Sequence, residues 1–395
     1  MNILITSIID LKKTPHSRLH HFVQYLSQNH KVTIVSINDW WKAGQTDVSL
    51  YGGFEDILCK VNIEYLTQHK INPVYQELSS IFTMGKTLDR IHFQQFDVHL
   101  NYNSLMSGYF AAEKLKHSGI KTIYDVADDL PTMVSSSPQI PVLLRPVGKL
   151  LGTIAFSRNV ALADRVTIIT ESLRKSLGIP PPKAMILPNG VDVELFNRRN
   201  SPQLKKQLDL DGAFVLGYVG VLREWVDLEP VFVTVKNLYF EAPIKVLVLG
   251  AEGGLNKNKA IVEKYDLANR VVFTGTVPYS QLPEYISCMD ACLIPFRDYP
   301  VSQNALPLKL FEYMACEKAV ISTRLKGVVE VVQDRVMYAS NSDELKIRVL
   351  ELYNNEWLRK NMGAAGREFV KGRYSWASVC LELERLLVET VGDKR

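Results

Sequence analysis

Residues 290–327 read DACLIPFRDYPVSQNALPLKLFEYMACEKAVISTRLKG and contain the pattern strand, polar loop, helix, strand. DACLIPF and KAVIST are short apolar runs typical of fully buried parallel strands. Between them, apolar residues recur at helical spacing, and Pro307 suits a first helical turn, where its missing N–H is not needed. The loop before Pro307 therefore lies at the carboxyl end of a strand and the amino end of a helix. Open α/β sheets bind ligands there, and the helix end favours an anion.

Two opposite charges, Lys309 and Glu312, lie one turn apart at the start of this helix. The helix dipole disfavours a cation near the amino end unless an anion lies beside it. A bound diphosphate would supply that anion, and Glu312 could accept hydrogen bonds from a ribose diol. The alternative that the spacing leaves open is a surface ion pair worth about 0.3–0.5 kcal/mol.

The composition excludes several classes of protein. A chain of 395 residues predicts two or three domains, and 47% hydrophobic with 22% charged residues is ordinary for a globular enzyme. A net charge of +4 without a basic run gives no sign of a nucleic-acid partner. The five scattered cysteines form no C-x-x-C pair, so we expect reduced thiols in a cytoplasmic protein, and no histidine has metal-ligand spacing.

The first half of the chain alternates apolar strands with helical segments, which predicts an α/β domain with a parallel sheet. The opening MNILITS fits a buried strand better than a signal peptide, and no apolar run reaches 18 residues. No G-x-G-x-x-G follows this strand, which argues against a nicotinamide or flavin enzyme. The second half repeats the same alternation.

The helix carrying Glu312, followed by Tyr-Met-Ala and then CEKAVI at 316–321, resembles a motif of the GT-B glycosyltransferases. That resemblance implies an α/β fold of two Rossmann-like domains facing across a cleft, with a C-terminal helix that crosses back to the N-terminal domain. The expected domains are residues 1–198 for the acceptor, 199–375 for the nucleotide sugar, and 376–395 for the returning helix.

A second stretch, GYVGVLREWVD at 217–227, fits the phosphate end of such a site. A glycine at a strand end lets a phosphate approach the backbone, and Arg223 could clamp it as a rigid fork. The alternative is a tight turn with an exposed arginine. VFTGTVP at 272–278 resembles the strand and turn that read the base. The donor-binding residues implied are Gly220, Val221, Arg223, Thr276, Val277, Asn304, Ala305, Leu306, Leu308, Lys309 and Glu312.

The tetrapeptide Asn189-Gly190-Val191-Asp192 resembles the end of the amino domain in the same family. The resemblance implies that Asn189 and Asp192 lie on the acceptor side. Asn-Gly is also a common turn that tolerates positive φ, so the tetrapeptide alone is a weak signal. We expect the linker between the domains at about 196–202.

Two adjacent acids, Asp128 and Asp129, follow a predicted strand in YDVADDLP at 124–131. Repulsion and desolvation would raise one pKa and suit a general base for an acceptor hydroxyl. The phrase resembles Y-D-x-x-D-D-x-P in membrane-associated transferases of capsule, teichuronic-acid and xanthan type, glucuronosyltransferases included. That resemblance favours Asp128 as the base, with Asp129 next. The alternative is that one aspartate caps a helix and its neighbour faces solvent.

Asn304 departs from the family pattern, because the commonest version has a second glutamate eight positions before the ribose-binding one. An amide there, together with the acidic pair, leans towards inversion of the sugar. Enzymes of this fold usually neutralise the leaving diphosphate with a helix dipole and with Arg or Lys. We therefore expect no metal and no cofactor.

Two further stretches remain open. Residues 37–96 are rich in aromatic side chains and predict either an insertion near an acceptor site or a buried aromatic cluster, with a helix at about 74–82. Residues 138–162 place leucines and valines among Arg145, Lys149 and Arg158. They predict an amphipathic helix resting on anionic lipid or an ordinary helix docked on its domain.

Taken together, the sequence predicts a cytoplasmic, membrane-peripheral glycosyltransferase of hexosyl type. It would move a sugar from a nucleotide donor, UDP before GDP, to a lipid-linked or glycan acceptor of a cell-envelope polysaccharide. Two alternatives keep the same fold. One is a catalytically silent subunit that binds a partner or a glycan, and the other is a sugar-nucleotide epimerase.

Overall fold

The computed structural model describes residues 1–14, 16–40, 54–136, 140–250 and 254–392. The chain forms two compact units, and each is described by itself. Unit 1 comprises residues 1–188 and 379–395, and unit 2 comprises residues 189–378. Part of the aromatic-rich stretch, with Trp41 and Tyr51, and the start of the 138–162 stretch lie outside the described residues.

Unit 1 is built on a parallel sheet of seven strands in the order β3-β2-β1-β4-β5-β6-β7. The strands are β1 (Asn2–Ser7), β2 (Lys31–Ser36), β3 (Asn62–Tyr65), β4 (Val98–Tyr102), β5 (Lys121–Val126), β6 (Arg165–Ile168) and β7 (Ala184–Ile186). β4 is buried along its whole length, and β1 and β5 along all but their first residue, as expected for strands covered on both faces. The sheet reverses its direction of winding between β1 and β4.

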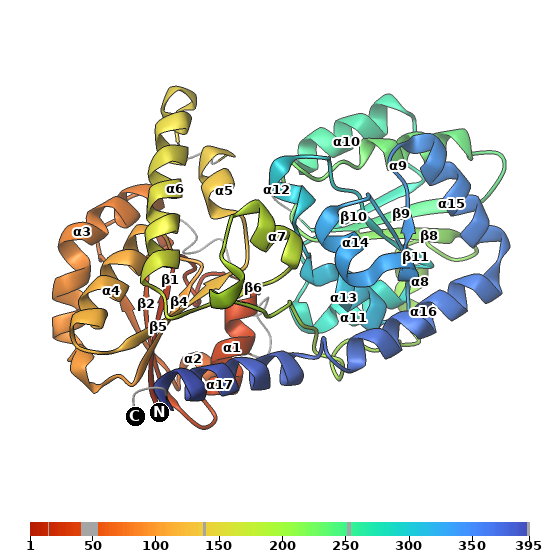
Figure 1. Cartoon of the computed structure of the whole chain (residues 1–395). Coiled ribbons are helices and arrows are strands. Elements are labelled where there is room, and N and C mark those ends of the chain that lie inside the picture. The colour runs from red at the N-terminus through yellow and green to blue at the C-terminus, as the bar shows by residue number, and fades with distance from the viewer. Residues whose placement is uncertain (15, 41–53, 137–139, 251–253, 393–395) are drawn as a thin grey trace. The chain divides into compact units, whose positions relative to one another are not determined.

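Helices cover both faces of this sheet (Figure 1). The principal ones are α1 (Arg18–Leu26), α2 (Glu55–Leu58), α3 (Pro73–Arg90), α4 (Met106–His117), α5 (Leu130–Ser136), α6 (Arg145–Leu162) and α7 (Glu171–Ser176), with the short turn η4 (Val142–Leu144) before α6. The last helix, α17 (Trp376–Gly392), begins in unit 2 and continues in unit 1. There Glu384 accepts hydrogen bonds from Tyr25 and pairs with His30.

Unit 2 has a parallel sheet of six strands in the order β10-β9-β8-β11-β12-β13. The strands are β8 (Phe214–Val219), β9 (Ile244–Leu249), β10 (Val271–Gly275), β11 (Ala291–Ile294), β12 (Ala319–Ser322) and β13 (Met337–Tyr338). Its helices are α8 (Pro202–Gln207), α9 (Glu229–Asn237), α10 (Leu255–Lys264), α11 (Leu282–Ser287), α12 (Pro300–Gln303), α13 (Leu308–Ala315), α14 (Lys326–Val332), α15 (Ser342–Asn354) and α16 (Glu356–Lys371). This sheet reverses between β8 and β11.

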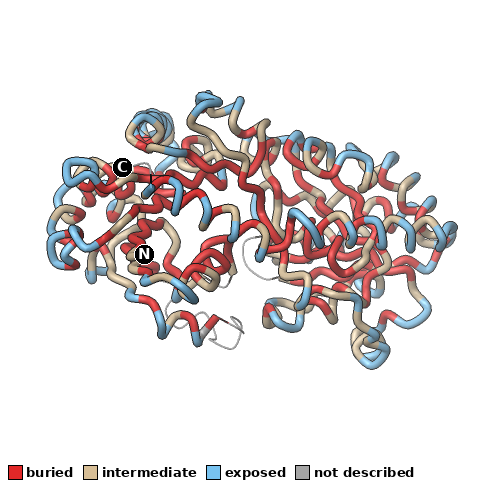
Figure 2. Tube along the Cα trace, turned by 60° about the horizontal axis from the view of Figure 1, so that its bottom comes forward, coloured by how far each residue is buried: buried red, intermediate tan, exposed pale blue. Residues whose placement is uncertain are grey.

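The apolar core of each unit lies along its central strands, such as β4 and β8, and buried segments gather in the interior of each unit in Figure 2. In unit 2, Tyr218 of β8 and Phe311 of α13 are fully buried. The Tyr313 hydroxyl on the same helix accepts a hydrogen bond from the Val219 N–H at 2.7 Å. The core therefore fixes α13 directly against the end of β8.

The α/β fold with two parallel-sheet domains is confirmed. Two short edge strands, β3 and β13, are not predicted by the sequence pattern, and α3 is twice the length of the helix predicted at 74–82. The border of the first compact unit lies at 188/189, not at 198/199. The reason is packing, because Val191 pairs with Ser375 and the buried Phe196 stacks against Tyr279, both in unit 2.

Candidate functional site

The reversal point of the unit 2 sheet brings together the carboxyl ends of β8 and β11, the place where open α/β sheets form ligand crevices. Gly220 follows β8, and Phe296 lies two residues past the end of β11. Helix α13, which contains Lys309 and Glu312, begins beside them with Pro307 as its N-cap residue. Residues predicted from separate stretches of sequence therefore meet at this point.

Three glycines with positive φ end the three neighbouring strands β8, β9 and β10: Gly220 (126°), Gly250 (133°) and Gly275 (73°). A Cβ on Gly220 would collide with the ammonium group of Lys309, and a Cβ on Gly250 would collide with the Gly220 carbonyl. Glycine is required here both for its backbone conformation and for the close approach. The Gly220 N–H donates to the Leu249 carbonyl at 2.8 Å, so its role is to leave space rather than to donate to a phosphate.

Lys309 is held over two aromatic rings at this crevice. Its ammonium lies 4.2 Å from the ring centre of Tyr218 and 5.5 Å from that of Phe296, and it donates a hydrogen bond to the Tyr218 hydroxyl at 2.8 Å. Burial lowers the pKa of Lys309 to about 7, although the Glu312 carboxylate opposes this shift. An arriving anion would raise that pKa and bring the lysine to full charge.

Glu312 is a buried carboxyl group on the same face of α13. The Tyr279 hydroxyl donates a long hydrogen bond of 3.4 Å to its Oε1. Burial raises the pKa of Glu312 to about 7, and Lys309 and Tyr279 lessen that rise. Glu312 is only 5% exposed and Lys309 is half-buried, so the two are not the surface ion pair that the sequence left open.

The other residues predicted at the donor site flank this pair at the same sheet edge. Val221 and Arg223 follow Gly220 and are exposed, and the charge of Arg223 acts on Tyr218, the ring beneath Lys309. Thr276, which is exposed, and Val277, which is half-buried, follow directly after Gly275. Their side chains form no crevice wall with Lys309, so their predicted contact with a base depends on their backbone.

The loop before α13 is packed more tightly than the sequence suggests. Asn304 and Leu306 are buried, and Ala305 and Leu308 are half-buried. The Ala305 N–H already donates to the Ser302 carbonyl at 3.0 Å, so this amide is not free to bind a diphosphate. Free donors for an anion begin at the first turn of α13, where helical N–H groups have no intrahelical partner.

Asn189 and Asp192, predicted on the acceptor side, lie in unit 2. The Asn189 side chain donates to the Leu306 carbonyl at 2.7 Å and thereby braces the loop before α13. Asp192 accepts hydrogen bonds from the N–H groups of Glu194 and Leu195. Gly190 is not in the left-handed region that the Asn-Gly pair suggests. It is glycine because the Trp376 ring packs against it.

In unit 1, the adjacent acids after β5 have separate surroundings. Asp129 accepts a hydrogen bond from the Thr132 N–H at 3.1 Å and so caps the start of α5. Asp128 is exposed and accepts a hydrogen bond from Asn103 Nδ2 at 3.2 Å. The protein packed around Asp128 raises its pKa, and the Asn103 hydrogen bond opposes this. Solvent at the exposed face of the carboxylate limits the rise, and the geometry favours Asp128 over Asp129 as a base.

Sequence reasoning missed a buried ion pair behind Asp128. The Arg18 guanidinium binds both oxygens of Asp125, at 3.2 and 3.1 Å, and also donates to the Leu187 and Pro188 carbonyls. Both side chains are almost fully buried. The two residues are separated by 107 positions, and only the Asp in Y-D-x-x-D-D hinted at the pair.

A second polar cluster after β1 was also missed. The buried Asp10 pairs with Lys13 at 3.1 Å and accepts a hydrogen bond from the Tyr65 hydroxyl at 3.1 Å. Lys13 in turn donates to Asn38 Oδ1 at 2.6 Å. These residues follow β1, β2 and β3, so the cluster lies at the carboxyl edge of the unit 1 sheet.

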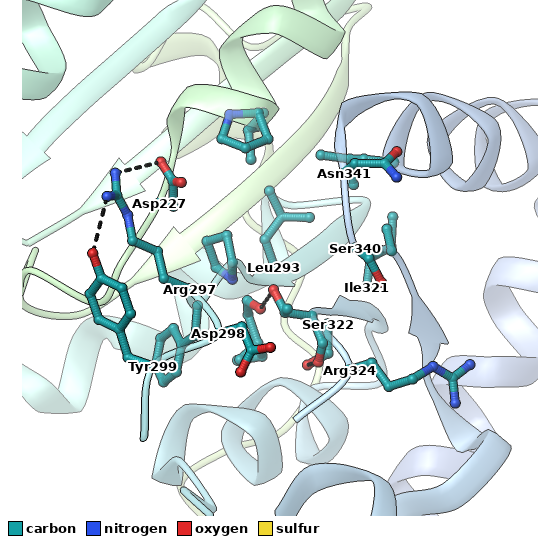
Figure 3. Close-up of a pocket in the computed structure, with 18 of the residues that line it drawn as sticks. Asp227, Leu293, Arg297, Asp298, Tyr299, Ile321, Ser322, Arg324, Ser340 and Asn341 are labelled. Atoms are coloured by element: carbon teal, nitrogen blue, oxygen red, sulfur yellow. Dashed lines mark hydrogen bonds and ion pairs between the residues drawn. The ribbon is translucent and has the colours of Figure 1, made fainter. Parts of the chain in front are cut away.

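A separate cavity of about 480 Å³ opens at the ends of β11 and β12. Figure 3 shows Arg297 between Asp227 and Tyr299, with 3.2 Å to the carboxylate and 3.5 Å to the hydroxyl. None of the residues predicted at the donor site lines this cavity. Phe296 belongs to its wall and also lies beneath Lys309, so the cavity and the crevice adjoin.

Across the described parts of the chain, no group of three or more His, Cys, Asp or Glu side chains is arranged to hold a metal ion. Within the same residues, none of the helices combines the length and the apolar character needed to cross a bilayer.

Comparison with known families finds a match to unit 2. Residues 200–369 match the family model described as Glycosyl transferases group 1, which covers nearly all of that unit. The chain is similar to TuaH of Bacillus subtilis strain 168, a candidate teichuronic acid biosynthesis glycosyltransferase, with 26% identity over 65% of this chain and 61% of that protein. It is also similar to N-acetyl-alpha-D-glucosaminyl L-malate synthase of Bacillus anthracis, with 21% identity over 81% of each chain.

The matched parts span less than two thirds of several relatives, among them TuaH at 61% and the Methanocaldococcus jannaschii glycosyltransferase MJ1178 at 64%. Among solved structures, HepE of Anabaena in complex with UDP superposes with a TM-score of 0.75 at 15% identity, covering 98% of this chain and 100% of that one. Sucrose-phosphate synthase of Thermosynechococcus elongatus gives a TM-score of 0.76 at 15% identity and full coverage of both chains. These likenesses show the GT-B fold.

Proposed function

We propose that the protein is a glycosyltransferase that takes a sugar from a nucleotide donor, with UDP as the preferred nucleotide. The observation that carries this proposal is that Lys309, whose ammonium lies beside Gly220, and the buried Glu312 share one turn of α13 at the reversal point of a sheet whose sequence matches the group 1 model. Such a pair is costly to keep unless it serves a ligand. The name of the HepE complex, which contains UDP, is consistent with this choice of nucleotide.

In this proposal the diphosphate binds between Gly220 and the first turn of α13. Lys309 becomes fully protonated beside it, and Arg223, which is exposed at the same edge, closes over the phosphates. Glu312 accepts hydrogen bonds from the ribose hydroxyls. Thr276 and Val277 contact the base through their backbone, and Asn304 with the Ala305–Leu308 loop borders the sugar.

The reaction then needs a base for the acceptor hydroxyl, and we assign that role to Asp128. The acceptor oxygen forms a bond to the anomeric carbon as the bond from that carbon to the diphosphate breaks, and Asp128 takes the hydroxyl proton. Its raised pKa suits this step, since a carboxylate that holds its proton more firmly is a stronger base. Asn304 in place of a carboxylate fits the inverting outcome.

We further propose that the acceptor is a lipid-linked or free glycan of a cell-envelope polysaccharide. The teichuronic acid assignment of TuaH supports this acceptor class. The free cysteines, four of which are buried, suit a reducing compartment and hence the cytoplasmic side of the membrane. The helix end and basic side chains at the diphosphate suit a metal-independent transfer of a hexose.

The test is UDP binding by the Glu312→Ala variant, measured by calorimetry on the full chain. A hydrogen bond to a charged group contributes about 1.5–3 kcal/mol, so we expect an affinity loss of roughly 10- to 100-fold. Glu368→Ala serves as the control, because Glu368 is an exposed glutamate in a surface pair with Lys371. Equal UDP affinity of both variants would remove Glu312 from the nucleotide site.

Release of UDP from UDP-sugars separates the remaining alternatives. A transferase releases UDP when a glycan acceptor is added and releases it slowly by hydrolysis without one. A silent subunit would bind the donor without turnover. An epimerase would convert the sugar nucleotide with no acceptor present.

A further inference from the structure

Unit 1 carries an unusual concentration of exposed apolar side chains. Eleven of the eighteen large apolar side chains that are exposed in the described residues lie on α3 or on η4 and α6: Tyr75, Leu78, Ile81, Phe82, Val142, Leu143, Leu144, Val147, Leu150, Leu151 and Ile154. We call this set the α3–α6 surface. Leu143 is 91% exposed and Phe82 is 76% exposed. Contiguous apolar surface of this kind marks a binding surface.

A groove of about 290 Å³ runs between α3, α5 and α6 within this surface. Its walls are almost entirely apolar and include Leu78, Val134, Val147 and Leu151. The one charged residue in its lining is Glu77.

The Glu77 carboxylate is already used within the protein. It accepts hydrogen bonds from the Met106 N–H at 2.9 Å, the Ser107 N–H at 3.2 Å and the Ser107 hydroxyl, and so holds the start of α4. The groove therefore offers no free charge to a ligand, and its chemistry suits a hydrocarbon.

Two glycines of α6, Gly148 and Gly152, line the groove. A Cβ on Gly152 would lie 3.7 Å from Pro131 Cα, and a Cβ on Gly148 would lie 3.2 Å from Ile140. Glycine at both positions keeps this side of the groove free of side chains. In Figure 1 the first turns of α6 extend beyond the sheet of their own unit.

The segment that carries α5, η4 and α6 has charged side chains of one sign only. Residues 130–163 contain no Asp or Glu and include Arg145, Lys149 and Arg158. Lys149 and Arg158 are exposed, and Arg145 is half-buried. A surface that is both apolar and basic matches an anionic lipid headgroup layer with hydrocarbon beneath it.

We propose that the α3–α6 surface docks on an anionic phospholipid bilayer, with a lipid hydrocarbon chain in the groove and Arg145 and Lys149 at the lipid phosphates. The helix lies on the membrane rather than across it, because α6 is neither long nor apolar enough to span one. Tyr75 and Phe82 on α3 suit the boundary between headgroups and chains.

The positive charge of α6 favours a bilayer over a second copy of the chain as the partner of the α3–α6 surface. A twofold pair would place the same basic helix against itself, and the like charges would repel. An anionic membrane instead attracts each of these side chains. Membrane binding does not depend on the proposed transferase activity, so the two can be tested apart.

The experiment is co-sedimentation of the full chain with vesicles of phosphatidylglycerol and phosphatidylcholine, and with phosphatidylcholine alone. We expect binding to the anionic vesicles that weakens with salt. The double variant Phe82→Asn, Leu143→Asn should bind roughly 30-fold or more weakly, because two large apolar side chains no longer enter the membrane. Arg145→Gln with Lys149→Gln should weaken binding about fivefold for each charge removed.

Matched controls lie on other surfaces. Phe240 is 98% exposed in unit 2 and Lys116 is exposed on α4, so Phe240→Asn and Lys116→Gln should leave vesicle binding unchanged. Thermal unfolding of each variant verifies that the fold is kept. Equal loss of binding in the control and surface variants would overturn the proposal.

A lipid with a photoactivatable group in mid-chain locates the site. After irradiation in anionic vesicles, we expect adducts on peptides from α3 and α6, including Leu78, Val147 or Leu151. Adducts confined to other elements would contradict the groove as the chain site. If the wild-type protein ignores vesicles and forms dimers that Leu143→Asn dissociates, the surface is an interface between copies and the proposal fails.

Discussion

The two sheets present their carboxyl ends in chemically different ways. In unit 2, the crevice is made by the backbone at Gly220, Gly250 and Gly275 and by two charges on one helix turn, Lys309 and Glu312. In unit 1, the same edge is made by side chains from separate strands, with Asp10 after β1 and Asp128 after β5. The sheet edge in unit 2 leaves room for a ligand, whereas the sheet edge in unit 1 is lined by hydrogen-bonding side chains.

The difference teaches how each site can be found. The crevice in unit 2 depends on glycines and on the start of one helix. These features occur as short contiguous motifs, so they can be recognised in the sequence. A site that depends on side chains from five strands is scattered, and only folding brings its members together. The difference between the two sheet edges also predicts that nucleotide binding and proton transfer reside in different units. Mutations should therefore impair one without the other.

The largest effect is expected at the acidic pair of unit 1. Asp128→Asn should lower the turnover number by roughly 10²–10⁴-fold, the usual contribution of a general base, while UDP affinity is unchanged. Asp129→Asn is the matched variant, and it should change stability and turnover little, because an asparagine oxygen can accept the same capping hydrogen bond. Turnover and UDP affinity are measured on the same preparations. Comparable turnover losses at both positions would show that the structure does not separate a base from a cap.

The next effect concerns acid stability, because all eight histidines precede residue 120 and so lie in unit 1. Burial lowers the pKa of His16 to about 3 and of His20 to about 4. Their unfolded pKa is about 6.5, so the unfolded chain binds more protons and stability falls as pH drops below 6.5. At pH 5, His16 and His20 should each lower the free energy of unfolding by about 2 kcal/mol.

Hydrogen exchange of the full chain at pH 7 and pH 5 measures this difference. Amides of β1 and β4 should lose protection at pH 5, whereas those of β8 and β9 should keep it. His20→Gln should reduce the loss in unit 1. Uniform loss of protection in both units would rule out the histidines as its cause.

A smaller effect is expected from glycine substitution in unit 2. Gly220→Ala places a methyl group at the Lys309 ammonium and should weaken UDP binding by roughly 10-fold or more. Gly212→Ala is matched to it, because Gly212 also has positive φ, at 70°, yet a Cβ there would meet nothing within 4 Å. Gly212→Ala carries the strain of left-handed backbone, and Gly220→Ala, at 126°, carries more, which thermal unfolding of the two variants measures. UDP titrations that show the same loss for both would trace the effect to strain and not to the crevice.

The smallest effect is the pH dependence of UDP binding. Because burial lowers the pKa of Lys309 to about 7, binding of a diphosphate should take up a proton above that pH. UDP affinity should therefore fall as pH rises from 7 to 8, by about fivefold for the uptake of one proton. Calorimetry in buffers of different ionisation enthalpy measures this uptake. Lys309→Arg should abolish it, and a pH-independent affinity in the wild type would contradict the coupling.

Much of the fold could be predicted from the sequence because its parallel strands are apolar runs separated by helical periods. The helix at Lys309 and Glu312 could be predicted for the same reason, with Pro307 as its start. The edge strand β13 could not be predicted, because a strand of two residues is too short to show a pattern of alternating apolar and polar side chains. The reason for glycine at position 190 could not be predicted, because the Trp376 ring that packs against it lies 186 positions away in the sequence.

Contacts between distant residues mark the limit of prediction for the site. The Arg18–Asp125 pair joins α1 to β5, and Asn189 braces the loop before α13 across 117 positions. The amphipathic character of 138–162 was visible from spacing, but its exposure was not, because that depends on how closely α3 and α5 pack beside it. The sequence shows which residues are apolar, but the packing of neighbouring helices determines which of them stay exposed to solvent.

The most direct test of the central claim is a crystal structure of the full chain with UDP. Difference density should place the diphosphate between Gly220 and the first turn of α13, with Lys309 at the phosphates and the ribose hydroxyls at Glu312. Density for UDP in unit 1, or in the cavity lined by Asp227 and Arg297, would contradict the account.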